Sequence, residues 1–117
     1  VHFSQTQLNF GINYLKDLIH ECKRKKIEII LVHAPLYYEL LQLIPQQDLF
    51  IQQVTELASK NAIQFWDYSQ DSVSFSKEYF YNSQHLNISG AEIFSEHLAK
   101  DLKQYVQNKY HASKSDD

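Results

Sequence analysis

The chain lacks methionine entirely and contains only two glycines, two prolines and one cysteine in its 117 residues. The single cysteine, Cys22, excludes an internal disulfide bond but leaves the redox compartment open. No apolar run approaches the roughly 20 residues that a helix needs to cross a bilayer, so we expect no membrane span in this segment. Because the first residue is Val1 and no methionine occurs, we expect the sequence to be a piece of a longer protein.

The chain also lacks a basic surface. Its formal net charge is -3, so no positive field is available to collect phosphates, and nucleic-acid binding is not expected. The one basic cluster, Lys23 to Lys26, follows an amphipathic stretch and is typical of a helix C-terminus. With 44% apolar residues the chain can bury one core, which excludes a disordered protein.

The apolar pattern predicts three helices and two strands. Leu8, Ile12, Leu15, Ile19 and Cys22 form one stripe on a helix over about 5–25. A strand over 27–33, a helix over 46–60 and a strand over 62–68 follow, which together predict a βαβ unit with parallel strands. The last helix is expected over 90–107, because Ser89 and Glu92 resemble a capping box, with a staple between Ile88 and Ile93.

These elements predict a single α/β domain, or part of one, over 1–110, followed by a flexible polar tail over 111–117. A sheet of two parallel strands has two open edges, so upstream strands or a partner chain should complete it. Self-association through such an edge would make the protein a homo-oligomer. The segment 69–87 between the last strand and the last helix is long and rich in serine and aromatic residues, which favours a functional loop.

His85 lies near the end of this loop, four residues before the expected N-cap of the last helix. On position alone, an isolated loop histidine is more often a surface residue than a functional one. The residues around it favour function, because Tyr81 to Leu102 resembles the C-terminal signature of the SGNH, or GDSL-like, serine hydrolases and acyltransferases. The matching core is His85-Leu86-Asn87, followed by Gly90 and Ala91. Residues 13–35 resemble the preceding helix and strand of that superfamily, in the branch that includes D-alanine transfer and other envelope acyl-modifying proteins.

The resemblance implies the C-terminal portion of a flavodoxin-like three-layer fold with a parallel sheet. It implies that His85 is the general base that activates a serine, working without a cofactor on an ester of a small molecule, lipid or glycan. It also suggests an envelope or extracytoplasmic location, although the sequence leaves the compartment unknown.

Two positions depart from the family pattern. The acid that orients the histidine lies three residues before it, where this chain has Asn82. Replacing such an acid with asparagine costs about four orders of magnitude in a serine protease, so either Asp71 or Asp67 substitutes for it or the site is weakened or inactive. The chain also has no Gly-Asp-Ser or Gly-x-Ser-x-Gly turn, and we therefore expect the nucleophilic serine upstream of Val1.

Other sites are poorly supported. The six histidines show no paired metal-ligand spacing, His97 is expected to be solvated, and His33 is the only other histidine expected near the active edge of the sheet. Six loop aromatic residues could line an acyl or sugar pocket, but most should fill the core: Tyr37, Tyr38, Phe75, Tyr79, Phe80 and Tyr81. Three hypotheses remain, namely an inactive fragment of an SGNH enzyme, a non-catalytic SGNH-like binding module with a degenerate triad, and an α/β interaction domain that dimerises.

Overall fold

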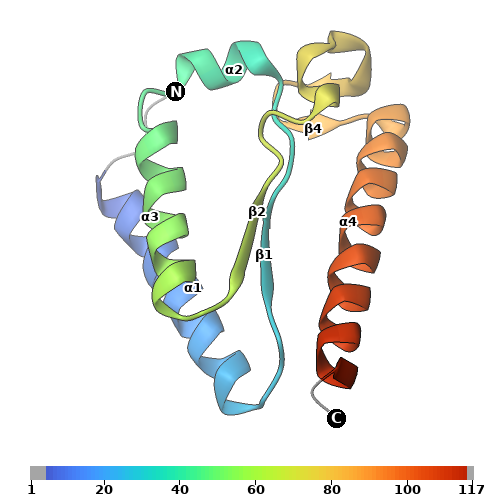
Figure 1. Cartoon of the computed structure of the whole chain (residues 1–117). Coiled ribbons are helices and arrows are strands. Elements are labelled where there is room, and N and C mark those ends of the chain that lie inside the picture. Colours follow the sequence, from blue (N-terminus) through green and yellow to red (C-terminus); the bar gives the residue numbers. More distant parts are fainter. Residues whose placement is uncertain (1–4, 116–117) are drawn as a thin grey trace.

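The computed structural model describes residues 5–115, with side chains described over 7–111. Figure 1 shows long helices flanking a narrow sheet, with a small hairpin between the sheet and the last helix. The helices are α1 (Gln5–Arg24), α2 (Tyr38–Leu43), α3 (Gln47–Lys60) and α4 (Ile88–Ser115). The strands are β1 (Ile30–His33), β2 (Gln64–Asp67), β3 (Phe80–Asn82) and β4 (His85–Leu86), and two 3-10 helices are η1 (Ser72–Phe75) and η2 (Lys77–Tyr79).

The strands β1 and β2 are parallel neighbours, as the sequence predicts. Ile30 lies opposite Gln64 and His33 lies opposite Asp67. The connection between them contains α2 and α3, which is the crossover that a parallel pair requires. The second sheet is an antiparallel hairpin in which Phe80 pairs with Leu86 and Asn82 with His85.

The prediction of a flavodoxin-like three-layer fold is wrong for this chain. The described residues are mostly helical, and the strands are short and divided between two sheets of two strands each. The first strand is shorter than expected. Residues 27–29 follow the turn after α1 and are not paired, so pairing with β2 starts only at Ile30. The residues 80–86, expected as part of a loop, form their own hairpin instead of extending the parallel sheet.

The core lies between the sheet and the pair formed by α1 and α3, which Figure 1 places together on one side of β1 and β2. Its buried members are Ile19, Leu31, Val54 and Leu57. Ile12 and Leu15 of α1 pack against these residues, as does Phe50 of α3. The predicted apolar stripe of α1 is therefore confirmed, and the burial of apolar residues from both helices supplies the main hydrophobic stabilisation of the fold.

Both helices that lead into the parallel strands end in the same type of turn. Lys26 after α1 has a φ of 59° and Ala62 after α3 has a φ of 54°, so each adopts the left-handed conformation usually taken by glycine. In each turn the next residue donates its backbone N–H back into the helix, from Ile27 to Cys22 O at 2.8 Å and from Ile63 to Ala58 O at 3.0 Å. The chain thus closes two Schellman turns without glycine, at the cost of backbone strain.

Helix α4 lies on the other side of β1 and β2 from α1 and α3 (Figure 1). It is longer than predicted, since it begins at Ile88 and continues to Ser115, into the segment expected as a mobile tail. Residues 116 and 117 of that expected tail lie outside the described residues. The predicted hydrophobic staple is wrong, because the Ile88 side chain is 80% exposed.

Polar contacts attach much of α4 to the rest of the fold. The Tyr68 hydroxyl donates to Asp101 Oδ2 at 2.6 Å, and burial together with this bond raises the pKa of Tyr68. Further along, Glu28 Oε1 accepts bonds from the Tyr105 hydroxyl and from Lys109 Nζ, both at 2.6 Å. Aromatic contacts accompany them, with ring centroids 5.2 Å apart for Tyr68 and Phe94.

Candidate functional site

The β3–β4 hairpin holds the two residues that the sequence predicts as a catalytic pair. Asn82 ends β3 and His85 begins β4, so a two-residue turn brings their side chains together. Asn82 Oδ1 lies 2.9 Å from His85 Nδ1. The residue three positions before the histidine thus contacts the imidazole directly.

A second hydrogen bond fixes the direction of this contact. The backbone N–H of Gln84 donates to Asn82 Oδ1 at 2.9 Å, so the atom facing the turn must be the amide oxygen and not the nitrogen. Because that oxygen only accepts hydrogen bonds, His85 Nδ1 carries the proton. The lone pair of the neutral imidazole is then on Nε2, for which the described residues provide no hydrogen-bond partner. His85 is therefore held in the tautomer that can accept a proton at Nε2.

The rest of the His-Leu-Asn motif has a structural role. Asn87 is the N-cap of α4, because its Oδ1 accepts from Gly90 N at 2.9 Å, while its Nδ2 donates to Glu78 O at 2.6 Å. This observation corrects the predicted capping by Ser89. Gly90 is required for close packing, since a Cβ atom there would lie only 2.2 Å from Tyr79 O. Asn87 and Gly90 thus position the hairpin against α4, whereas His85 itself is exposed and contributes little packing.

The alternative carboxylates do not reach His85. Asp71 accepts from His97 Nδ1, with oxygens at 2.9 and 3.1 Å, and also caps η1 by accepting from Val73 N at 3.2 Å. The prediction that His97 is solvated is therefore wrong, because its ring is partly shielded and hydrogen-bonded to the Asp71 carboxylate. Asp67 accepts from Ser69 N at 2.9 Å and lies 3.9 Å from His33 Nδ1. Within the described part of the chain, Asn82 is the orienting partner of His85.

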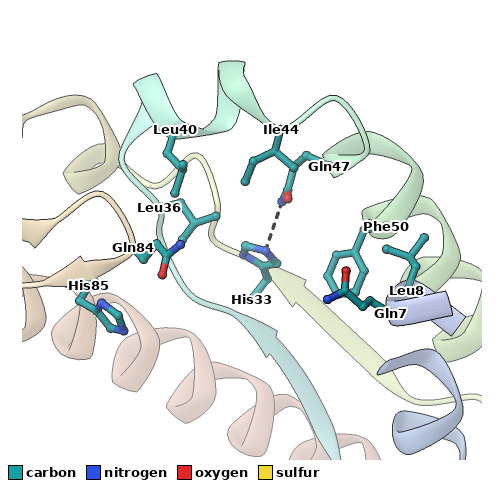
Figure 2. Close-up of a pocket in the computed structure, with 10 residues that line it drawn as sticks. All are labelled: Gln7, Leu8, His33, Leu36, Leu40, Ile44, Gln47, Phe50, Gln84 and His85. Atoms are coloured by element: carbon teal, nitrogen blue, oxygen red, sulfur yellow. Dashed lines mark hydrogen bonds between the residues drawn. The ribbon is translucent and has the colours of Figure 1, made fainter. Parts of the chain in front are cut away.

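A pocket of about 490 Å³ opens beside the hairpin (Figure 2). His85 and Gln84 lie on one side of it, and Figure 2 shows His33 between them and Phe50. Its lining is largely apolar, with contributions from α1, α2, α3 and the loop after β1: Leu8, Leu36, Leu40, Ile44 and Phe50. The two histidines that the sequence singled out near the active edge therefore line one pocket.

Tyr37 connects the two walls of this site. Its backbone N–H donates to Ser83 O at 3.1 Å, which ties the loop after β1 to the turn of the hairpin. Its ring lies 5.5 Å from that of Phe80 and 5.0 Å from that of Tyr38. Tyr37 and Phe80 thus support the hairpin. The prediction that most of the six aromatic residues fill the core is wrong, because none of them is buried, and Phe75 and Tyr81 are 58% and 82% exposed.

His33 also has a defined environment. Its Nδ1 lies 2.8 Å from Ala34 O, and its Nε2 lies 3.2 Å from Gln47 Nε2. Since a carbonyl oxygen only accepts, Nδ1 carries the proton and Nε2 accepts from the Gln47 amide. The position of His33 before Pro35 pointed to this edge of the sheet, but its partner Gln47, in the crossover helix, had no local sequence signal.

Other kinds of site find little support. Over residues 5–115, no group of three or more histidine, cysteine or acidic side chains is arranged to hold a metal ion. In the same range no helix is long and apolar enough to span a membrane. None of the serines with described side chains hydrogen-bonds to His85, whose one protein partner there is Asn82. The pocket therefore contains a candidate base without a serine beside it.

Comparison with known proteins identifies a family but no activity. The model of an uncharacterised family matches residues 2–107, so the chain belongs to that family. No curated protein matches the chain, and no solved structure matches it either.

Proposed function

We propose that the chain is the C-terminal part of an SGNH-type serine esterase or acyltransferase and supplies the general-base histidine, His85. The nucleophilic serine of that enzyme lies on a segment upstream of Val1. The observation that carries the proposal is the double hydrogen bond to Asn82 Oδ1, from Gln84 N and from His85 Nδ1. This arrangement presents an unprotonated Nε2 at the edge of an apolar pocket, which is the geometry that serine activation requires.

In the proposed reaction, His85 Nε2 accepts the proton of the serine hydroxyl as the oxygen attacks the ester carbonyl, and later returns it to the leaving alcohol. Asn82 orients the imidazole throughout, but its neutral amide stabilises the imidazolium less than a carboxylate would. The substrate is an ester of a small molecule, lipid or glycan. The apolar lining of the pocket provides space for its acyl group.

The proposal is tested in the full-length protein by ester hydrolysis. His85→Ala should abolish nearly all turnover without unfolding the protein, because the exposed ring contributes little packing. His20→Ala is the matched control, since His20 is exposed on α1 and away from the pocket. Unchanged turnover in His85→Ala would remove the catalytic role.

Asn82→Asp gives a sharper test. An aspartate can accept the same two bonds, from Gln84 N and His85 Nδ1, and adds a negative charge beside the imidazolium that forms during the reaction. Turnover should rise by an order of magnitude or more, given the roughly 10⁴-fold loss for the reverse change in a serine protease. The 117-residue chain alone should hydrolyse activated esters no faster than free imidazole, because it lacks nucleophile and oxyanion donors.

A second candidate is an SGNH-like binding module with a degenerate triad, favoured by the asparagine at position 82. This module would occupy the same pocket without turnover. The Asn82→Asp variant separates the two, since it creates activity only where the nucleophile is present.

Self-association is a further expectation for the isolated chain. Within the described residues, β1 and β2 pair only with each other, so each leaves an unpaired edge that a second copy could cover. Light scattering should show a concentration-dependent increase in mass. A monomer at all concentrations would contradict it.

A further inference from the structure

Five apolar and five polar residues line the pocket beside His85, and two of the polar ones, His33 and Gln47, lie in contact. Leu36, Leu40 and Ile44 line it near His33, and Figure 2 shows the Gln47 amide pointing at the His33 ring. His33 is largely buried, with 16% of its side chain exposed. A polar pair inside an apolar cavity is the usual way in which a pocket fixes the orientation of its ligand.

The hydrogen-bonding state of this pair is defined. His33 donates through Nδ1 to Ala34 O and accepts at Nε2 from Gln47 Nε2. The contact between Nε2 and the amide nitrogen measures 3.2 Å, at the long end of the range for such bonds. The single lone pair on His33 Nε2 is occupied by this bond and becomes available to a ligand only when the bond opens, whereas the Gln47 amide keeps a second N–H. Once the bond opens, the two groups present one acceptor and one donor to a ligand.

We propose that His33 and Gln47 bind a hydroxyl group on the acyl chain of the ligand, whose apolar part fills the rest of the pocket. The inference rests on the proposed function, in which His85 acts at the ester bond. A hydroxyl is both donor and acceptor, so it can donate to His33 Nε2 while it accepts from Gln47 Nε2. One ligand group then replaces a long hydrogen bond with two.

The surroundings disfavour charged alternatives. A carboxylate would face the lone pair of the neutral His33 ring, with the Asp67 carboxylate 3.9 Å from the other ring nitrogen. An ammonium group has no acceptor capacity and would face the amide N–H of Gln47. An unsubstituted alkyl chain leaves the polar pair without new partners and gains only apolar burial.

Binding is measured by NMR titration of the 117-residue protein with methyl octanoate, methyl 3-hydroxyoctanoate and methyl 8-hydroxyoctanoate. At least one hydroxylated ester should bind about fivefold more tightly than methyl octanoate, the factor expected for one net neutral hydrogen bond. The His33 ring nitrogens should shift with the hydroxylated ligand. Gln47→Leu should remove the preference while methyl octanoate still binds.

Two controls separate this inference from the proposed function. Gln84→Leu changes a pocket residue on the hairpin side and should keep the preference. His85→Ala should also keep it, because binding at His33 does not need the base. A retained preference in the 117-residue His85→Ala variant, together with full turnover of His85→Ala in the full-length protein, would defeat the proposed function alone.

Several outcomes would overturn the inference. Equal affinities for the three esters would show that His33 and Gln47 do not bind the hydroxyl group. Tighter binding of monomethyl octanedioate through His33 would show an anion site instead. Absence of binding by every probe would show that the pocket does not accept acyl chains.

Discussion

The carboxylate of Asp71 accepts a hydrogen bond from Nδ1 of His97, and its two oxygens lie 2.9 and 3.1 Å from that nitrogen. The pair joins the start of η1 to the third turn of α4 and is partly shielded, with side-chain exposures of 10% for Asp71 and 39% for His97. It resembles an acid–histidine pair of a catalytic site, but it does not line the pocket that contains His85. The contact between Asp71 and His97 therefore attaches α4 to the segment that contains η1.

We expect Asp71 and His97 to be coupled in stability and not in activity. A double-mutant cycle with Asp71→Asn and His97→Gln should give a coupling of about 1 kcal/mol, as for a partly exposed charged hydrogen bond. Chemical denaturation of the four proteins measures it. A coupling near zero would show that other contacts hold α4. Loss of turnover in Asp71→Asn at full stability would show instead that this carboxylate serves His85.

The tautomer of His85 can be observed directly. Long-range ¹H–¹⁵N spectra at neutral pH should show the proton on Nδ1, because Asn82 Oδ1 can only accept. Asn82→Leu should shift the population toward the Nε2-protonated form, which free imidazole favours. His33 provides an internal control, since its Nδ1 proton is bound by Ala34 O and should not respond. A wild-type spectrum with the proton on Nε2 would contradict the assigned hydrogen bond.

The two glycines should respond in opposite directions to substitution by alanine. Gly90→Ala places a Cβ atom 2.2 Å from Tyr79 O and should cost about 2 kcal/mol or more, since backbone must move. Gly11→Ala, inside α1 with nothing within 4 Å of its new Cβ, should stabilise the protein by about 0.5–1 kcal/mol. Thermal denaturation compares them. Equal effects would show that α4 does not pack closely on Tyr79.

The left-handed residues in the two helix-to-strand turns offer a route to higher stability. Lys26→Gly and Ala62→Gly should each stabilise the protein by up to about 1 kcal/mol, because glycine removes the steric cost of a positive φ. Ala99→Gly, on an exposed face of α4, should instead destabilise it by about the same amount. Destabilisation in all three variants would contradict the Schellman geometry.

Acid should loosen the far end of α4 first. The Lys109 ammonium and the Tyr105 hydroxyl hold the pKa of Glu28 below its usual value. Since the folded pKa is the lower one, this contact stabilises the protein at neutral pH and is lost as the pH falls through the range where Glu28 takes up a proton. Amide exchange around residues 105–109 should therefore accelerate in acid relative to α3. Glu28→Gln should show the faster exchange already at neutral pH.

The sequence predicts well those elements whose residues lie close together in the chain. The stripes of α1 and α3 follow from apolar spacing, and the parallel pairing of β1 and β2 follows from the crossover between them. The contact of Asn82 with His85 spans only a tight turn, and the family resemblance of the motif suggested it by placing the orienting group three residues before the histidine.

The failures come from contacts between distant segments. Asp71 and His97 are 26 residues apart, and no sequence pattern around either residue indicates that the two are in contact. The same applies to His33 and Gln47, which meet only after the crossover folds. The expected large sheet rested on resemblance rather than on strands present in this chain, and two short pairs formed instead. The N-cap of α4 was misplaced because Ser89 and Glu92 match a capping box, while Asn87 makes the bond.

The two ends of the Asn87 amide have a mechanical consequence. One end caps α4 through Gly90 N, the other holds Glu78 O, and the backbone N–H of Asn87 binds Tyr79 O at 2.9 Å. His85 is two residues away on a strand of only two residues, so these three bonds connect the first turn of α4 to the strand that carries the imidazole. A change in the position of α4 is therefore expected to alter the position of His85 at the pocket.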